Sequence, residues 1–414
     1  MKNIVVSTIF MIICSALVVG AGIAHREYEA GLLETADSDA DAASDPSDDV
    51  ISVWYCDSEL DDYLAALSQT YADEKNITIE LTYCAQSEML EEINAANIDD
   101  DLRNADVYFI STESLEKAYL SGLAAEIDDA DTFNSESFSE TAISACTYHG
   151  KLIAYPFCFE TSMLAYNTDY VDEAPRTFDE ILDAAGDEET ELGGDVTYVM
   201  KWDVNSLQYN FAFAGSYLEY GGQDGDDESI LDLNSDEVVL AMEYYYSLSD
   251  FFSIDPDDAE YDDVLADFAS GEIVYTIINT KSIKTLDSSG ISYEVCVLPD
   301  MSDELETAAL SLTTAAVINP YAENEDAAAE LVDHICFEGA GDVYEHGGSL
   351  SCAGSELTSS GKLSEAMKAY DESVSLPKLM SAGDYWVYLE IALNEVWSGQ
   401  DINETMNTLE EKVR

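Results

Sequence analysis

Glu160 is the residue whose surroundings most clearly require a chemical explanation, because it is a carboxylate inside an otherwise apolar stretch. Phe157, Cys158 and Phe159 precede it, and Met163 follows it. Charged side chains are rarely enclosed by such residues unless they are paired or used. A carboxylate accepts hydrogen bonds from two hydroxyl groups at once. The position is therefore a candidate for a ligand-binding carboxylate, and the alternative is a surface glutamate on a bent strand.

Aromatic residues near the C-terminus offer a second kind of contact. The segment Asp384–Tyr388 reads DYWVY and contains Tyr385 and Trp386. A flat aromatic ring can stack against an apolar face of a ligand, while its polar atom takes a hydrogen-bond partner. Packing of an aromatic helix start into the core is the competing interpretation.

Further acids follow two apolar runs that are typical of buried strands. Asp57 and Glu59 come after Ile51–Tyr55, and Glu113 comes after Asp106–Ile110. In open α/β sheets, ligands bind beyond the carboxyl ends of the strands. We therefore expect these acids to face one site, with a solvated surface acid as the alternative for each, since the chain has 87 acidic residues.

Motifs for catalysis or metal binding do not stand out. The sequence contains no GxSxG or HExxH motif and no CxxC pair, which are the arrangements expected for a serine nucleophile, a zinc protease or a zinc site. We therefore expect no catalytic residue, no metal and no cofactor.

The elements that would position these residues alternate between strand and helix. Apolar runs at Ile51–Tyr55, Ile77–Leu81 and Asp106–Ile110 predict strands, and helical spacing falls between them at 60–71 and 89–95. This alternation predicts parallel βαβ units and an α/β fold.

The remainder of the chain is less regular and becomes mostly helical in its last third. Leu152–Phe157 and Met163–Asn167 are predicted as two strands with Pro156 near the break, and Asn205–Ala214 as a helix. The last helix is predicted to start after Asp401, which can act as its N-cap.

The charge is extreme, with 87 acidic residues against 15 basic ones and a net charge of −72. Nucleic acid is excluded as a partner, because phosphate backbones are bound by clustered Lys and Arg. Anionic lipid headgroups are excluded for the same reason. The acids are spread along the whole chain, so a solvated, self-repelling surface is favoured over a cation site.

The N-terminus carries an export signal. Lys2 precedes an apolar run from Ile4 to Ala24, which suits either a signal peptide or an uncleaved membrane anchor over residues 1–24. Residues 25–50 are rich in Asp and small residues, as expected for an acidic disordered linker. An extracytoplasmic protein, tethered to the outer face of the cytoplasmic membrane, is therefore expected.

Eight cysteines are present, of which Cys14 lies in the apolar run. The other seven form an odd set, and buried free thiols are favoured for a chain of this size. A disulfide between Cys56 and Cys84 is left open.

Several segments then carry a family resemblance. Tyr148–Asn167 reads YHGKLIAYPFCFETSMLAYN, and it is followed by PRTFDEI at 175–181, FASGEIVYTI at 268–277 and VLP at 297–299. Segments 315–320 and 380–399 continue the series. Their order and spacing resemble the bacterial extracellular sugar-binding proteins of the maltose-binding type, from about residue 52 to the end.

The resemblance implies a two-lobed periplasmic-binding-protein-like fold (class II) with three crossings between the lobes. One lobe would hold 51–158 and 310–354, and the other 159–309 and 355–414. The ligand, a carbohydrate, would lie in the cleft and be enclosed by a hinge motion. The expected function is the substrate-binding component of an ABC importer, monomeric, not an enzyme, with transmembrane permease subunits as partners. A glycoside hydrolase with paired carboxylates and a surface adhesion module are the alternatives.

The resemblance also assigns residues to the site. Glu160, Trp386, Glu113 and Asp203 fall on ligand-contacting positions of the family, and Tyr385 shares the tryptophan segment. The family pattern is broken elsewhere, because Ile110, Ser114, Asn205 and Lys281 stand where a tryptophan, an arginine, an aromatic residue and a second tryptophan are expected. Maltose itself is therefore in doubt, and Lys281 could face an acidic ligand group such as a uronate.

Overall fold

The computed structural model describes residues 50–99, 102–127, 132–135, 137–186, 196–354, 358–359 and 361–414. The predictions for residues 1–24 and 25–49 lie outside the described residues. No helix within the described residues has the length and apolar character needed to cross a bilayer.

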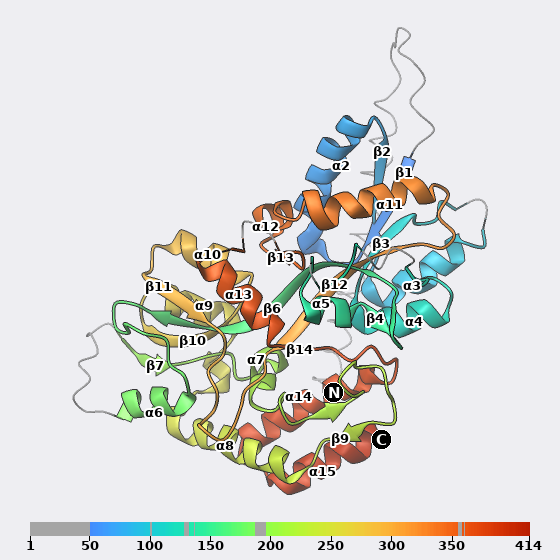
Figure 1. The fold of residues 1–414 in the computed structure, drawn as a ribbon. Helices are drawn as coiled ribbons and strands as arrows, with labels where there is room; N and C mark the ends of the chain where they lie inside the picture. Colours follow the sequence, from blue (N-terminus) through green and yellow to red (C-terminus); the bar gives the residue numbers. More distant parts are fainter. Residues whose placement is uncertain are drawn as a thin grey trace, which may run out of the picture. The chain divides into compact units, whose positions relative to one another are not determined.

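The first elements form the expected parallel βαβ units (Figure 1). They are β1 (Val50–Tyr55), α2 (Asp61–Lys75), β2 (Thr78–Tyr83), α3 (Gln86–Ala96) and β3 (Val107–Ser111). Strand β1 pairs in parallel with both β2 and β3. The carboxyl ends of the three strands therefore reach the same edge of the sheet, which confirms the predicted α/β class.

A long central strand, β6 (Tyr155–Asn167), replaces the two strands predicted around Pro156. That prediction was wrong because residues 158–161, which lay between the two predicted strands, pair with β12 (Leu310–Ile318), and Pro156 lies only at an irregularity of this pairing, where the register shifts between Thr314 and Ala315. A bulge accommodates a residue that has no N–H to donate. The strand therefore continues through the proline.

Strand β6 joins the two parts of the main sheet, as Figure 1 shows in green. Its first half pairs with β12 and β13 (Leu350–Ser351), and its second half pairs with β10 (Ile273–Asn279) and β11 (Tyr293–Cys296). The strand order along the sheet is β2-β1-β3-β12-β6-β10-β7, where β7 is Tyr198–Met200.

Helices dominate the C-terminal part. Helix α14 (Ala382–Trp397) packs against α15 (Ile402–Val413) and α8 (Asp236–Phe252). Asp401 caps α15 by accepting a hydrogen bond from the Glu404 N–H, which confirms the predicted cap.

The predicted helix over Asn205–Ala214 is only partly present, as α7 (Leu207–Asn210) and a 3₁₀ turn at Phe211–Phe213. The Asn210 side chain explains the short helix, because its oxygen accepts from Trp202 Nε1 and its nitrogen donates to the Val204 carbonyl. These contacts hold the end of α7 against the segment that precedes it, and the chain continues as the 3₁₀ turn.

The remaining helices and strands span the following residues: η1 (Ser58–Leu60), η2 (Thr112–Ser114), α4 (Leu115–Leu120), α5 (Glu140–Ala145), β4 (Thr147–Tyr148), β5 (Lys151–Leu152), α6 (Phe178–Gly186), β7 (Tyr198–Met200), β8 (Glu219–Tyr220), β9 (Leu231–Asp232), η4 (Pro256–Asp258), α9 (Tyr261–Ala269), α10 (Ser282–Ser289), α11 (Glu325–Asp333), η5 (His334–Glu338), α12 (Asp342–Gly347), α13 (Gly361–Asp371) and β14 (Val374–Ser375).

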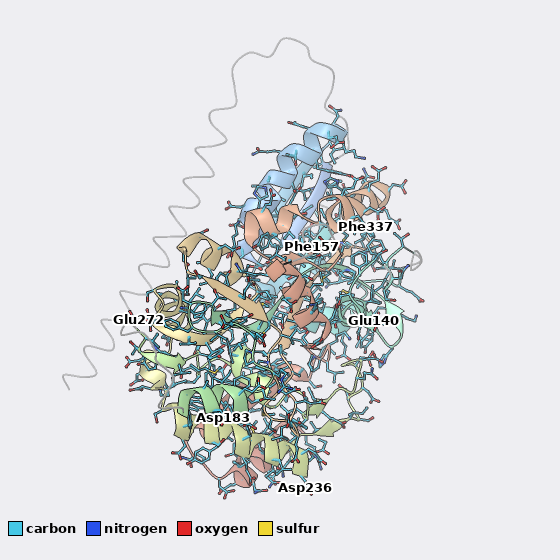
Figure 2. The ribbon with its side chains drawn as sticks, turned by 60° about the vertical axis from the view of Figure 1, so that its left-hand side comes forward. Glu140, Phe157, Asp183, Asp236, Glu272 and Phe337 are labelled. Carbon is cyan, nitrogen blue, oxygen red and sulfur yellow. The ribbon has the colours of Figure 1, made fainter. Side chains whose placement is uncertain are left out.

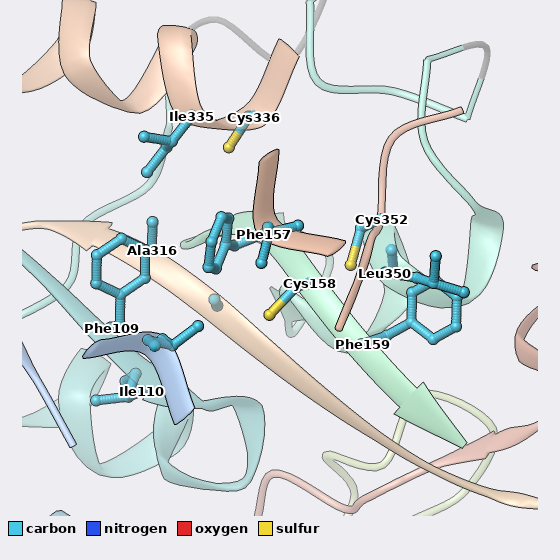
Figure 3. Packing of buried hydrophobic residues seen from close by; sticks show 14 of the residues in the cluster. Phe109, Ile110, Phe157, Cys158, Phe159, Ala316, Ile335, Cys336, Leu350 and Cys352 are labelled. Carbon is cyan, nitrogen blue, oxygen red and sulfur yellow. The ribbon is translucent and has the colours of Figure 1, made fainter. Parts of the chain in front are cut away.

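Buried apolar side chains form two clusters that meet on β6. Met163 belongs to one cluster and Leu164 to the other, because successive side chains of a strand point to opposite faces of the sheet. Figure 3 shows the first cluster around Phe157, whose ring centroid lies 4.9 Å from that of Phe109. The second cluster surrounds Trp202, which is fully buried.

Acidic side chains lie mostly at the surface of the described residues, as Asp183, Asp236 and Glu272 do in Figure 2. Four described acids are buried, and most of their hydrogen-bond donors are main-chain N–H groups: Asp106, Glu116, Asp203 and Asp226. This distribution supports the solvated-surface interpretation of the charge.

Cysteines within the described residues are all free thiols, including Cys56 and Cys84. The disulfide left open by the sequence is therefore not formed in this structure.

Candidate functional site

A cavity of about 260 Å³ lies at the carboxyl ends of β1 and β3, and we call it the strand-end cavity. Asp57 and Glu113, which follow these strands, line it together with Gln86 at the start of α3 and Glu160 on β6. The structure therefore brings three of the predicted acids to one hollow, in the place that parallel strand ends provide.

Glu113 is held by Gln86, whose Nε2 donates a hydrogen bond to Oε1 at 2.6 Å. Burial raises the pKa of the Glu113 carboxyl, and the hydrogen bond from Gln86 opposes that rise. The carboxylate is thus partly desolvated and has one protein donor on one oxygen, which leaves the other oxygen for a ligand.

Glu160 occupies the middle of β6 and is half-buried rather than fully exposed. Asn279 Nδ2 donates to its Oε2 at 2.6 Å, and Lys281 Nζ donates to its Oε1 at 3.1 Å. Both partners follow the apolar part of β10, the neighbouring strand. The carboxylate is therefore fixed in orientation toward the cavity that it lines.

Lys281 ties Glu160 to Glu59, which follows β1 in sequence, because its ammonium also forms an ion pair with that carboxylate. Burial alone would lower the pKa of Lys281, but the Glu160 and Glu59 carboxylates outweigh it and raise the pKa above its usual value. The ammonium is thus engaged on two sides by protein acids. Glu59 itself stays outside the lining of the strand-end cavity.

Replacing Lys281 with methionine is expected to lower the free energy of unfolding by about 2 kcal/mol, because Glu160 loses its cationic partner in a largely buried setting. Urea unfolding measures the change. Lys284→Met is the matched control, since Lys284 is exposed and donates to main-chain carbonyls of α12. The free energy of unfolding of the control is expected to stay within about 0.5 kcal/mol of the unsubstituted protein. An equal loss of stability in both variants would contradict the proposed role of the ion pair.

A second cavity, of about 310 Å³, adjoins the first, and we call it the tryptophan cavity. It shares Glu113, Leu312 and Leu376 with the strand-end cavity and adds Trp386 and Glu390 of α14. Trp386 is half-buried, so one part of its ring packs on the protein while another part remains open. An indole in this position can stack on a ligand that extends from the carboxylates.

A third and larger cavity, of about 680 Å³, lies beside the β8–β9 hairpin and is called the hairpin cavity. Tyr385 lines this cavity, and its ring centroid lies 4.7 Å from that of Tyr220. Its size alone does not make it the better candidate, because the strand-end acids do not line it. The structure thus separates Tyr385 from the predicted carboxylates, although Trp386 lines both hollows.

Asp203 is likewise not brought to the carboxylate group, since it lines none of these three cavities. It is buried and accepts a hydrogen bond from the Asn205 N–H at 2.9 Å. Burial raises the pKa of Asp203, and the hydrogen bond from Asn205 opposes the rise. The geometry is that of a turn-forming aspartate ahead of α7.

Two polar residues of this region were missed by sequence reasoning. Gln86 and Asn279 orient Glu113 and Glu160, yet each is separated from its partner by many residues, 27 and 119 respectively. The available signal was their position at the carboxyl ends of strands, because Gln86 begins the helix that follows β2 and Asn279 is the last residue of β10. No group of three or more metal-ligating side chains is assembled among the described residues.

Comparison with known proteins supplies the family. Residues 66–338 match the family model described as bacterial extracellular solute-binding protein. A maltodextrin-binding protein of Bacillus subtilis, MdxE, is 21% identical over 378 residues, covering 85% of this chain and 88% of that protein. A maltooligosaccharide ABC transporter solute-binding lipoprotein of Streptococcus pneumoniae is 22% identical over 308 residues, covering 73% of this chain and 71% of the relative.

Solved structures show the same fold. A cyclo/maltodextrin-binding protein in complex with maltotetraose superposes with a TM-score of 0.73 at 21% identity, covering 90% of this chain and 97% of that one. An extracellular solute-binding protein from Staphylococcus aureus in complex with maltose gives a TM-score of 0.74 at 20% identity, with coverages of 90% and 98%. The predicted two-lobed periplasmic-binding fold is thereby confirmed. The chain belongs to the bacterial extracellular solute-binding proteins, a family of binding proteins rather than enzymes.

Proposed function

We propose that the protein captures a soluble carbohydrate outside the cytoplasmic membrane and delivers it to the transmembrane subunits of an ABC importer. The ligand lies across the strand-end and tryptophan cavities and is enclosed by closure of the two lobes. Glu160, Asp57 and Glu113 accept hydrogen bonds from ligand hydroxyls, and Trp386 stacks on a sugar ring.

One observation supports the proposal most directly: Glu160 and Glu113 line the strand-end cavity, and Glu113 and Trp386 line the tryptophan cavity beside it. Carboxylates bind vicinal hydroxyls, and an indole covers the apolar face of a sugar. The relatives named for maltodextrins and maltooligosaccharides support the same ligand class.

A thermal-shift panel tests the proposal, because a ligand that binds only the folded state stabilises it by about 2.7 kcal/mol at a hundredfold excess over Kd. Linear maltodextrins, cellodextrins and monosaccharides form the panel. One class of saccharide is expected to raise Tm and to be recovered chemically intact. Absence of any shift across the panel contradicts carbohydrate capture, and turnover of the sugar contradicts a binding role.

Trp386→Ala is expected to weaken binding of the saccharide found in the panel about tenfold, because a stacking surface worth about 1.4 kcal/mol is removed. Isothermal titration calorimetry measures the change. Tyr388→Ala is the control, since Tyr388 is a half-buried aromatic residue of the same helix that lines none of the three cavities. A loss of affinity in Tyr388→Ala as large as that in Trp386→Ala would refute the stacking role.

The N-terminal segment suits this role. An export signal and an acidic spacer over residues 1–50 would hold the binding unit at the outer face of the membrane, near the permease. Fractionation of cells that express the full chain tests this, with the protein expected in the membrane fraction and accessible to external protease. A monomer is proposed as the working form.

A further inference from the structure

The charged residues that line the strand-end and tryptophan cavities have one sign. Four acids line them, and no Lys, Arg or His lines either cavity among the described residues: Asp57, Glu113, Glu160 and Glu390. Acids are frequent throughout this chain, but most of those in the described part of it are exposed. The acids of the strand-end cavity are half-buried, so their charge is less screened by water.

Lys281 does not supply the missing positive charge to a ligand. Its side chain is only 18% exposed, and its ammonium is bound by Glu59 and Glu160. The group formed by these three residues carries a net negative charge. A ligand carboxylate placed beside it would meet an excess of acids, which disfavours the uronate that Lys281 suggested at the level of sequence.

Two of the acids that line the strand-end cavity each have one carboxylate oxygen without a donor among the described residues. Glu113 uses Oε1 for Gln86, and Asp57 uses Oδ1 for the Glu59 N–H. No described residue donates a hydrogen bond to Glu113 Oε2 or Asp57 Oδ2. A ligand ammonium has three N–H donors and no acceptor, and hydrogen bonds between charged groups are about twice as strong as neutral ones.

We propose that this site selects a saccharide that carries a protonated amino group over its neutral and acidic analogues, with the amine bound by Glu113 and Asp57. The inference rests on the proposed function, because the cavities and the family provide the site and the acids decide only which sugar it prefers. Neutral saccharides remain ligands, since carboxylates also accept from hydroxyl groups. Acidic saccharides are rejected by like charge.

Matched probes test the preference by titration calorimetry at low ionic strength. A β-1,4 glucosamine trisaccharide is compared with cellotriose, which carries hydroxyl groups in place of the amines. In an α-1,4 series, 1-amino-1-deoxymaltotriitol is compared with maltotriitol and with the aldonic acid maltotrionate. The amine is expected to bind about tenfold more tightly than the neutral partner, which corresponds to 1.4 kcal/mol. The acid is expected to bind more weakly than either.

The outcomes separate the two proposals. Equal or weaker binding of the amines overturns the amino-sugar preference and leaves carbohydrate capture standing. Failure of every saccharide in both series to bind overturns both. Added salt is expected to reduce the advantage of the amine, because it screens charge pairs and leaves stacking unchanged.

The variant Glu113→Gln tests whether Glu113 causes the preference for the amine. The amide keeps the shape of the side chain but removes its charge, so the amine is expected to lose about tenfold more affinity than the neutral partner. Glu237→Gln, at an exposed position in the first turn of α8, is the matched control for removal of one negative charge. If both variants change the ratio of amine to neutral affinity equally, the effect comes from the overall charge of the protein, and the assignment to Glu113 is overturned.

Discussion

Replacing Tyr370 with alanine is expected to lower the free energy of unfolding by about 3–5 kcal/mol, the usual cost of deleting a large buried ring. Tyr370 lies on α13, is fully buried, and stacks on Phe159 of β6 with ring centroids 3.9 Å apart and planes 7° apart. Its hydroxyl is 2.7 Å from Thr313 Oγ1 on β12. The side chain therefore fixes a helix to the strands that pass between the two halves of the sheet, and urea unfolding measures the loss.

Two variants make the Tyr370 result interpretable. Tyr370→Phe keeps the stack and removes only the hydrogen bond, so a smaller loss of about 1 kcal/mol is expected. Tyr321→Ala removes a tyrosine that is 58% exposed, and a change within about 0.5 kcal/mol is expected. A similar loss in Tyr321→Ala and Tyr370→Ala would show that the ring stack is not what stabilises the central strands.

Replacing Glu160 with alanine is expected to weaken saccharide binding by about 2–3 kcal/mol, or roughly 30–150-fold. The carboxylate is oriented by Asn279 and Lys281 and lines the strand-end cavity. Its removal therefore takes away charged oxygen atoms that are already oriented to accept hydrogen bonds from the ligand. Titration calorimetry with the saccharide found in the panel measures the change.

Glu59→Ala is the control for Glu160, because it removes the other carboxylate that contacts Lys281 without altering the lining of the strand-end cavity. The affinity of this variant for the saccharide is expected to stay within about threefold of that of the unsubstituted protein, because an exposed ion pair contributes little free energy. If Glu59→Ala and Glu160→Ala weaken binding equally, Glu160 acts by holding Lys281 and does not contact the ligand.

The α/β fold could be predicted from the sequence, because two of its signals are local. These are the alternation of apolar runs with helical spacing and the ordered motifs from Tyr148 to Gly399. The sequence also predicted that Asp57 and Glu113 would share a hollow, since parallel strands end at one edge, although Glu59, which was predicted with them, lies outside the lining of that hollow. The break predicted at Pro156 was wrong because a single proline was weighed without knowledge of the bulge that accommodates it.

The remaining features of the site depend on contacts between distant parts of the chain. Lys281 pairs with Glu59, 222 positions away, and no local pattern indicates that pairing. Tyr385 and Trp386 are neighbours in sequence, yet Tyr385 lines only the hairpin cavity while Trp386 also lines the tryptophan cavity. Which of two adjacent rings reaches the carboxylates is decided by how α14 packs on its neighbours, and that is a property of the tertiary structure.

The interrupted pairing of β6 has a mechanical consequence. Strand β6 stays paired with β12 on both sides of this point, so turning one part of β6 against the other twists paired strands. An irregularity of this kind bends the strand and increases its local twist, and it lies at Pro156 and Cys158 of β6. Glu160 lies only two residues further along the same strand. We therefore expect any twisting of β6 at this irregularity to change the direction in which the Glu160 carboxylate points.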